Sequence, residues 1–242
     1  MQDLLPILLL AALLGGIVQG VSGFAFSIVF MATMQYFMPY TALLSLTSIL
    51  AVAMLAVNAF VYRKDIVWRW IPLPLLINFL FTMGALRFLN YTMGFAYWHK
   101  LLGVVFIVLA IYLYGWQQKI QIQPTLGNML IFCGAGGIMG GLFGVGGPLV
   151  VLYFLAIADS KERYLSTTQI FFFLNMLYDF AGRCFNGMVT SATFQYAAVS
   201  ISVVLLGLWI GNKIFRRVDA DMLKKIVYGV MFVDGWYMLL CR

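Results

Sequence analysis

The feature that most constrains this chain is a series of ten apolar segments, several of which are long enough to cross a membrane. A helix needs about 20 residues to cross roughly 30 Å of hydrocarbon, and the segment from Thr41 to Tyr62 reaches that length. Apolar residues make up 64% of the chain and charged residues only 10%, whereas soluble domains carry about 25% charged residues. The runs are continuously apolar and lack the alternation of a membrane β-strand. We therefore expect an all-α polytopic membrane protein.

The ten segments divide evenly around a polar linker. They run from Leu4 to Gly20, Gly23 to Met38, Thr41 to Tyr62, Val67 to Arg87, Trp98 to Trp116, Leu126 to Gly141, Gly147 to Ala158, Tyr164 to Cys184, Ala192 to Gly211 and Met222 to Leu240. The residues before Leu4 lack the positive n-region of a cleaved signal peptide, so we expect the first segment to be retained.

A shift of about 121 residues superimposes the two halves of the chain. The pairs under this shift are Gly16 with Gly137, Gly20 with Gly141, Gly23 with Gly144, Ser45 with Ser166, Thr47 with Thr168 and Ser48 with Gln169; with small gaps, Gly84 pairs with Gly207 and Gly103 with Gly229. We infer a first repeat over residues 1–118, a linker over 119–125 and a second repeat over 126–242.

Each half opens with an apolar stretch that is too long for one crossing. Leu4 to Met38 has 35 residues and would span about 52 Å as one helix. Glycines interrupt it near Ser22 and Gly23, and they interrupt Leu126 to Ala158 between Gly144 and Gly147. We expect each stretch to break there into two short helices, each either a marginal span or a re-entrant half.

The distribution of lysine and arginine supports these hairpins. With both stretches broken, eleven basic residues fall on one side of the membrane and four on the other, against nine and six for unbroken crossings. The eleven are Arg63, Lys64, Arg69, Lys119, Lys161, Arg163, Lys213, Arg216, Arg217, Lys224 and Lys225; the four are Arg87, Lys100, Arg183 and Arg242. The count predicts periplasmic termini and two inverted repeats of about five segments each, as in many secondary transporters.

The glycine breaks are candidate anion sites. Non-helical backbone at membrane depth lies inside protein or beside a water-filled cavity. A helix that begins near Gly147, with Pro148 in its first turn, directs free N–H groups and a positive dipole end at a ligand, which suits an anion. By the repeat, a second helix start lies near Gly23. The alternative is that the glycines are helix-packing residues, because Gly16 to Gly20 and Gly137 to Gly141 have GxxxG spacing.

Polar residues within the apolar segments form a second group of candidates, since charge in hydrocarbon usually marks a transport pathway. The eighth segment contains Thr168, Gln169, Asn175, Asp179 and Arg183. The 7 and 4 spacing of Thr168, Asn175 and Asp179 places them on one helix face, and Asp179 and Arg183 are spaced to pair. The alternative for that pair is a structural ion pair.

The other polar candidates lie in the third and last segments. Thr47, Ser48 and Asn58 are the neutral counterparts in the third segment, and Asp234 is the deep acid of the last segment. The alternative for Asp234 is a purely structural role.

Several classes of protein are disfavoured. The net charge of +7 arises from short loops between apolar segments, so it indicates membrane topology and no nucleic-acid partner. Cys133, Cys184, Cys241 and the single His99 are too scattered for a metal site. No GxSxG, HExxH, Walker A or CxxC pattern occurs, so we expect neither an enzyme nor a cofactor.

Gly141-Leu-Phe-Gly-Val-Gly-Gly-Pro148, together with Ser166-Thr167-Thr168 and Phe185-Asn186-Gly187, resembles the TauE/SafE family, also called the sulfite exporter or toluenesulfonate uptake permease family. The resemblance covers essentially the whole chain, although Phe24, Ala25 and Phe26 depart from the glycine run in the first half. It implies transport of sulfite or an organosulfonate such as sulfoacetate across the bacterial inner membrane, coupled to protons or another ion.

Residues and resemblance together predict where the anion binds. We expect contacts from Ser22, Gly23, Phe24, Ser48, Gly146, Gly147, Pro148, Thr168, Gln169, Asn175 and Arg183, with Asp179 or Asp234 carrying the coupling proton. Two alternatives are an anion channel and a non-transporting scaffold or accessory subunit of a sulfur-metabolism complex. The partners expected are the small anion and membrane lipid, and the oligomeric state, a homo-oligomer included, stays open.

Overall fold

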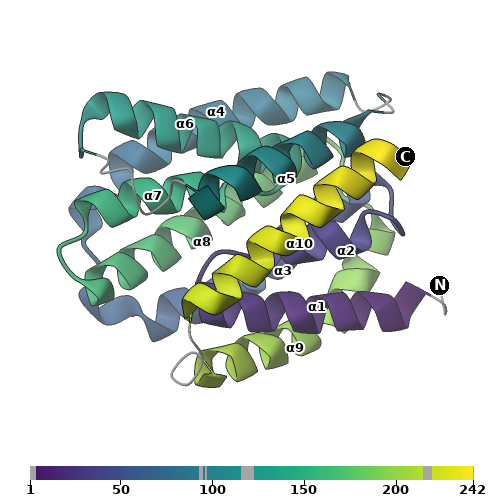
Figure 1. The fold of residues 1–242 in the computed structure, drawn as a ribbon, viewed down its shortest axis with the longest axis horizontal. Coiled ribbons are helices and arrows are strands. Elements are labelled where there is room, and N and C mark those ends of the chain that lie inside the picture. The colour runs from purple at the N-terminus through teal and green to yellow at the C-terminus, as the bar shows by residue number, and fades with distance from the viewer. Residues whose placement is uncertain (1–3, 93–94, 96, 116–122, 215–219, 242) are drawn as a thin grey trace. The chain divides into compact units, whose positions relative to one another are not determined.

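The computed structural model describes residues 4–92, 95, 97–115, 123–214 and 220–241. These residues form ten α-helices and two 3-10 turns, η1 (Arg63–Asp65) and η2 (Trp68–Trp70), so the predicted all-α class is confirmed (Figure 1). The helices are α1 (Leu4–Ser22), α2 (Phe26–Met34), α3 (Tyr40–Val61), α4 (Pro72–Tyr91), α5 (Trp98–Gly115), α6 (Leu126–Phe143), α7 (Gly147–Ile157), α8 (Lys161–Phe185), α9 (Ser191–Ile214) and α10 (Ala220–Cys241).

Five stretches of the described chain are long and apolar enough to cross a membrane. Four of them are the helices α1, α3, α6 and α9, and the fifth is Trp68–Tyr91, which comprises η2 and α4. Shorter apolar helices occur at Trp98–Tyr112, Gly147–Ile157 and Met231–Leu240. The nine residues of α2 cover only about 14 Å at 1.5 Å per residue. Helices of that length cannot cross the bilayer alone, so α2 and α7 are partial spans.

Both predicted breaks are confirmed, and the helix before each break ends at a glycine with positive φ. Gly144 has φ 71° and closes α6 in the left-handed conformation, with its N–H donating to Gly140 O over 2.9 Å. Gly23 has φ 84°, and its N–H donates to Gln19 O over 2.7 Å. Glycine adopts this conformation without steric cost and commonly ends helices. The helix therefore breaks in both opening stretches at glycines that the sequence repeat pairs with each other.

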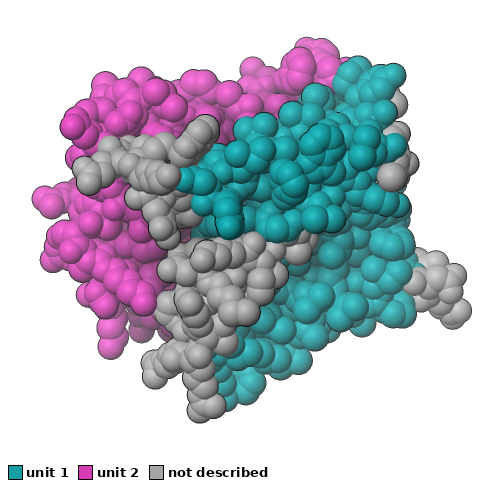
Figure 2. All heavy atoms as spheres, in the orientation of Figure 1, with its two compact units in different colours: residues 1–43, 93–120, 198–242 teal, residues 44–92, 121–197 magenta. Residues whose placement is uncertain are grey.

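The helices belong to two compact units, shown in teal and magenta in Figure 2. Unit 1 consists of residues 1–43, 93–120 and 198–242, and unit 2 of residues 44–92 and 121–197. Each unit draws segments from both halves of the sequence, and α3 and α9 are divided between them. The division into repeats at residues 1–118 and 126–242 stays a prediction, and most of the linker lies outside the described residues.

Unit 1 is held together by glycines at helix contacts. In α1, a Cβ on Gly16 would lie 2.4 Å from Val204 O of α9, and one on Gly20 would lie 2.7 Å from Leu208 O. Helix α5 runs beside α10 (Figure 1), where a Cβ on Gly103 would meet Gly235 O at 2.9 Å. Backbones approach this closely only where a residue has no side chain, as in small-residue seams of membrane helices.

Unit 2 contains the same kind of glycine packing between α4 and α6, which lie side by side (Figure 1). A Cβ on Gly137 of α6 would lie 2.5 Å from Asn78 O of α4, and one on Gly141 would lie 3.0 Å from Thr82 O. Gly16 and Gly20 therefore correspond to Gly137 and Gly141 in packing as well as in sequence. For these four glycines, the packing interpretation is confirmed.

The α4–α6 seam allows a direct test with a matched pair of glycines. Gly137→Ala should lower stability by about 1 to 3 kcal/mol through overpacking. A Cβ on Gly84 of α4 would have nothing within 4 Å, so Gly84→Ala should instead raise stability by about 0.5 to 1 kcal/mol. Thermal unfolding of the two purified variants in detergent measures the difference. Equal shifts would mean that the seam is not tightly packed.

Candidate functional site

Helix α8 carries the main polar surface of unit 2. It begins after Ser160, whose Oγ accepts the N–H of Arg163 over 3.3 Å. Although α8 is surrounded by apolar helices, it buries seven polar or charged side chains: Ser166, Thr167, Thr168, Gln169, Asn175, Asp179 and Arg183. Buried polar groups need partners inside the protein. The partners of α8 therefore define how this unit is organised.

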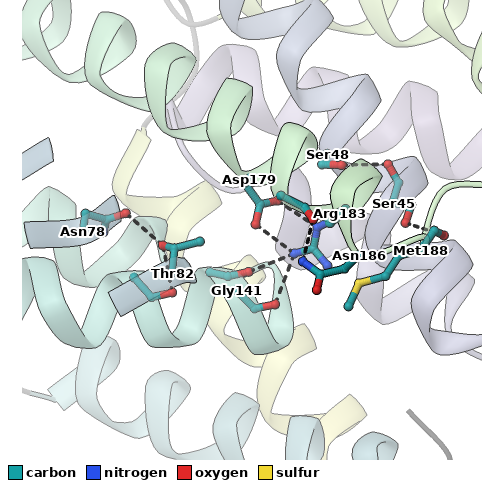
Figure 3. A network of polar contacts seen from close by, with 12 residues as sticks. Ser45, Ser48, Asn78, Thr82, Gly141, Asp179, Arg183, Asn186 and Met188 are labelled. Atoms are coloured by element: carbon teal, nitrogen blue, oxygen red, sulfur yellow. Dashed lines mark hydrogen bonds and ion pairs between the residues drawn. The ribbon is translucent and has the colours of Figure 1, made fainter. Parts of the chain in front are cut away.

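The two charged groups among them are Asp179 and Arg183, and the predicted pair is confirmed. Arg183 Nε donates to Asp179 Oδ2 over 2.9 Å, and Nη2 donates to Oδ1 over 3.1 Å. Asp179 is 2% exposed and Arg183 is 0% exposed. Such a two-point contact between guanidinium and carboxylate fixes both groups in one geometry. Figure 3 shows the pair at the centre of a polar network.

Arg183 also reaches the end of α6. Its Nη2 donates to Gly140 O over 3.3 Å and to Gly141 O over 3.2 Å, which are carbonyls of the last helical turn (Figure 3). Gly140 O is the same atom that accepts the N–H of Gly144. The guanidinium is thus attached directly to the glycine break between α6 and α7, where its positive charge is favourable at a helix C-terminus.

The start of α7 lies in that break. Gly146 precedes the helix, no side chain caps it, and Pro148 occupies the first turn. Gly146 approaches α6 closely, because a Cβ there would lie 2.0 Å from Gly136 O. Gly146 and Pro148 are buried, and Gly147 is partly exposed. Gly146 therefore packs against the same turn of α6 whose Gly140 carbonyl accepts Arg183.

Two amide pairs connect α8 to its neighbours. Asn58 Nδ2 of α3 donates to Gln169 Oε1 over 3.1 Å. Asn175 Nδ2 donates to Asn78 Oδ1 of α4, and Asn78 in turn donates to Cys133 O of α6 over 2.8 Å. These contacts join α8 to α3 and α4 at points on both sides of its midpoint, and they join α4 to α6.

The two hydroxyl candidates bond within their own helices. Thr168 Oγ1 donates to Tyr164 O over 2.6 Å, and Ser48 Oγ donates to Ser45 O over 2.8 Å. Ser45 Oγ also donates to Met188 O over 3.1 Å, which ties α3 to the segment after α8 (Figure 3). Both hydroxyls are buried, so they belong to the interior of unit 2.

The remaining candidates at a break are Ser22, the last residue of α1, and Gly23 and Phe24, which follow it before α2 in unit 1. Here side chains already serve the backbone: Ser22 Oγ accepts the N–H of Phe24 over 3.4 Å. Gln19 Oε1 accepts the N–H of Phe26 over 3.0 Å, and Gln19 Nε2 donates to Gly23 O over 2.9 Å. An anion at this helix start would have to displace Ser22 or Gln19 from these amides.

Asp234, the other predicted acid, lies in unit 1 on α10. Gln35 Nε2 donates to its Oδ2 over 2.9 Å, and Tyr36 Oη donates to its Oδ1. Gln35 and Tyr36 directly follow α2. Asp234 therefore joins the end of α2 to α10 without a basic partner in these contacts, unlike Asp179.

Three important residues were not among the predicted candidates. Gln19 organises the first break, and Asn78 and Thr82 bridge α4 to α6, where Thr82 Oγ1 donates to Gly137 O over 3.1 Å. Each is a polar residue inside an apolar segment, the same signal that identified Thr168 and Asn175. The amide of Gln19 also sits within the first glycine motif.

Membrane-length helices, two of which end at left-handed glycines before a partial helix, and a fully buried ion pair define a multi-pass membrane protein. The chain belongs to the TauE/SafE family, since the family model described as sulfite exporter TauE/SafE matches residues 8–238. That family consists of transporters and not of enzymes, so membership indicates a transporter of sulfur-containing anions. No curated protein and no solved structure matches the chain.

Proposed function

We propose that the protein is a secondary transporter that moves a small sulfur-containing anion across the bacterial inner membrane, driven by an ion gradient. The substrate is sulfite or an organosulfonate such as sulfoacetate. The observation that carries the proposal is the buried Arg183, held by Asp179 at the glycine break between α6 and α7. A sulfonate is compact and permanently negative, and guanidinium groups with backbone N–H donors can replace its water.

Two features of this break support an anion as its ligand. A buried cation in a membrane protein is costly and usually has a function. The start of α7 also has no side-chain cap, so its first N–H groups add a positive dipole end to the same region. Pure packing accounts for Gly137 and Gly141, but it does not account for the ion pair attached to the end of the same helix.

The test is uptake into proteoliposomes of a panel of labelled anions containing sulfite, methanesulfonate, toluenesulfonate and sulfoacetate. We expect saturable uptake of at least one of them and accumulation against its gradient when an ion gradient is imposed. Saturation and uphill movement distinguish a transporter from a channel. A purified, folded protein that moves none of the panel would contradict the proposal and favour a scaffold or accessory role.

The amide of Gln169 provides a test of the substrate-binding wall. Gln169→Ala should weaken anion affinity by about 1 to 3 kcal/mol, the cost of a lost hydrogen bond to a charged group. Gln195 of α9 is exposed, so Gln195→Ala is the matched control and should bind as the wild type does. Affinity is measured on purified protein by calorimetry. Equal affinities in both variants would place the anion away from Gln169.

Topology supplies an independent prediction. From the charge count, we expect both termini in the periplasm and the turn containing Arg63 and Lys64 in the cytoplasm. Lys64 is exposed in η1, whereas the second marker loop, Arg216 and Arg217, lies outside the described residues. Labelling of single cysteines placed at Lys64 and after Arg242 should occur from opposite sides. Labelling of both from one side would refute the inverted arrangement.

A further inference from the structure

One nitrogen of the Arg183 guanidinium, Nη1, makes no hydrogen bond to the described residues. Nε and Nη2 bond Asp179, and Nη2 also bonds the carbonyls of Gly140 and Gly141. Nη1 is buried and has no hydrogen-bond partner among the residues that the structure describes. A buried charged donor without a partner is costly. Since the other nitrogens are occupied, Nη1 is the position where a further acceptor can approach the guanidinium.

Charge limits which acceptor can stay there. Asp179 and Arg183 together are neutral, so an anion added to the ionised pair leaves a net negative charge in a buried site. Low-dielectric surroundings disfavour such an uncompensated charge. Protonation of Asp179 removes the excess, because the carboxylic acid is neutral and the anion then pairs with Arg183 alone. Anion binding and proton binding are therefore favourable together and unfavourable apart.

Resting on the function proposed above, we propose that the substrate anion and the Asp179 carboxylate exchange places on Arg183. The anion first meets Nη1, Asp179 takes up one proton from water, and the anion replaces it at Nε and Nη2. On release, the proton leaves Asp179 for water and the carboxylate returns to the guanidinium. No bond other than O–H is made or broken, and one proton accompanies each anion.

The surroundings of Asp179 contain no competing charge among the described residues. Arg183 is the charged group that acts on it. Among other titratable groups on helices packed here, Cys133 of α6, Tyr153 of α7 and the adjacent Tyr178 are neutral thiol or phenol groups at neutral pH. The charged residues of η1 and α4 are exposed: Arg63, Lys64, Asp65 and Arg87. Proton occupancy at this site is thus determined by the Asp179 and Arg183 pair and by the anion.

The sequence repeat supports a stoichiometry of one proton at this exchange site. Under the shift of 121 residues, the counterpart of Asp179 is Asn58, which donates to Gln169 and cannot titrate. Unit 2 therefore has one exchange site on the α3 and α8 pair. A monovalent anion carried with one proton moves no net charge, which is a measurable property of the wild-type protein.

The experiment uses reconstituted full-length protein and methanesulfonate, which is monovalent throughout the usable pH range, with sulfite beside it. In the wild type, we expect methanesulfonate uptake to respond to a pH gradient and to ignore an imposed membrane potential. Apparent affinity should fall about tenfold for each unit of pH increase, the slope of one linked proton. Wild-type uptake that moves net charge overturns the exchange even if no variant can be purified.

Two aspartate variants complete the test. Asp179→Asn keeps the shape of the side chain and removes the titration, so anion affinity should lose its pH slope and uptake should follow the membrane potential. Asp159, exposed and paired with Arg163 at the same spacing, provides the control Asp159→Asn, which should behave as the wild type. If anion affinity in Asp179→Asn still depends on pH, the proposed exchange is overturned, but the proposed transport function is not. Absence of flux for all four anions of the panel in the wild type overturns the proposed function, and the exchange with it.

Discussion

Replacement of Arg183 by methionine should destabilise the protein by about 3 to 5 kcal/mol, the cost of breaking a buried ion pair by removing one partner. The reason is that Asp179 would be left buried and unpaired, and the carbonyls of Gly140 and Gly141 would lose their shared donor. Anion transport should be lost as well, because the proposed site loses its cation. Thermal unfolding in detergent and proteoliposome uptake measure the two effects.

The chain contains its own control for this experiment. Arg163 pairs with Asp159 at the same spacing of four residues, at the start of the same helix, but the two side chains are 52% and 53% exposed. Exposed pairs contribute only about 0 to 1 kcal/mol. Arg163→Met should therefore change stability little. If Arg183→Met is no more damaging than Arg163→Met, the buried pair contributes neither to stability nor to a charged site.

A double variant separates stability from function. Changing Asp179 to leucine together with Arg183→Met removes both charges, and such replacements of buried pairs by apolar residues are often neutral or stabilising. We expect the double variant to regain most of the lost stability and to remain inactive in transport. Recovery of both properties would show that the pair has a structural role only.

The features that could be predicted from the sequence are those formed by residues close together along the chain. The Asp179 and Arg183 pair follows from i, i+4 spacing on one helix, and the breaks at Gly23 and Gly144 follow from the conformational freedom of glycine. Both were identified because their partners lie within one or two helical turns. The all-α class followed from segment length alone.

Contacts between distant helices could not be obtained in this way. Asn78 meets Cys133 O across 55 positions and Asn58 meets Gln169 across 111, and nothing local specifies these pairings. The repeat aligned Gly84 with Gly207, yet Gly207 packs against α1 while Gly84 faces open space. Similar residues at aligned positions thus have different environments, because each packs against a different neighbour.

The tightest backbone approach at the candidate site leads to the second large expected effect. Gly146→Ala should lower stability by about 3 kcal/mol or more, at or above the upper end of ordinary overpacking, and should abolish anion binding. The added Cβ would lie 2.0 Å from Gly136 O and 2.9 Å from Gly140 N. These are backbone atoms of α6, so no side-chain rotation can relieve the clash and α7 must move away.

That movement would alter the site through Gly140, whose carbonyl accepts Arg183 Nη2. Gly187→Ala is the control, because Gly187 has φ 68° but nothing within 4 Å of its Cβ position. It should show only the strain of a left-handed residue, about 1 to 2 kcal/mol, with normal anion affinity. The anion affinities of the two variants are compared by calorimetry on the folded fraction of each protein. If Gly146→Ala is as stable as Gly187→Ala and binds the anion normally, the close contact between the α6–α7 break and Gly136 does not hold the binding geometry.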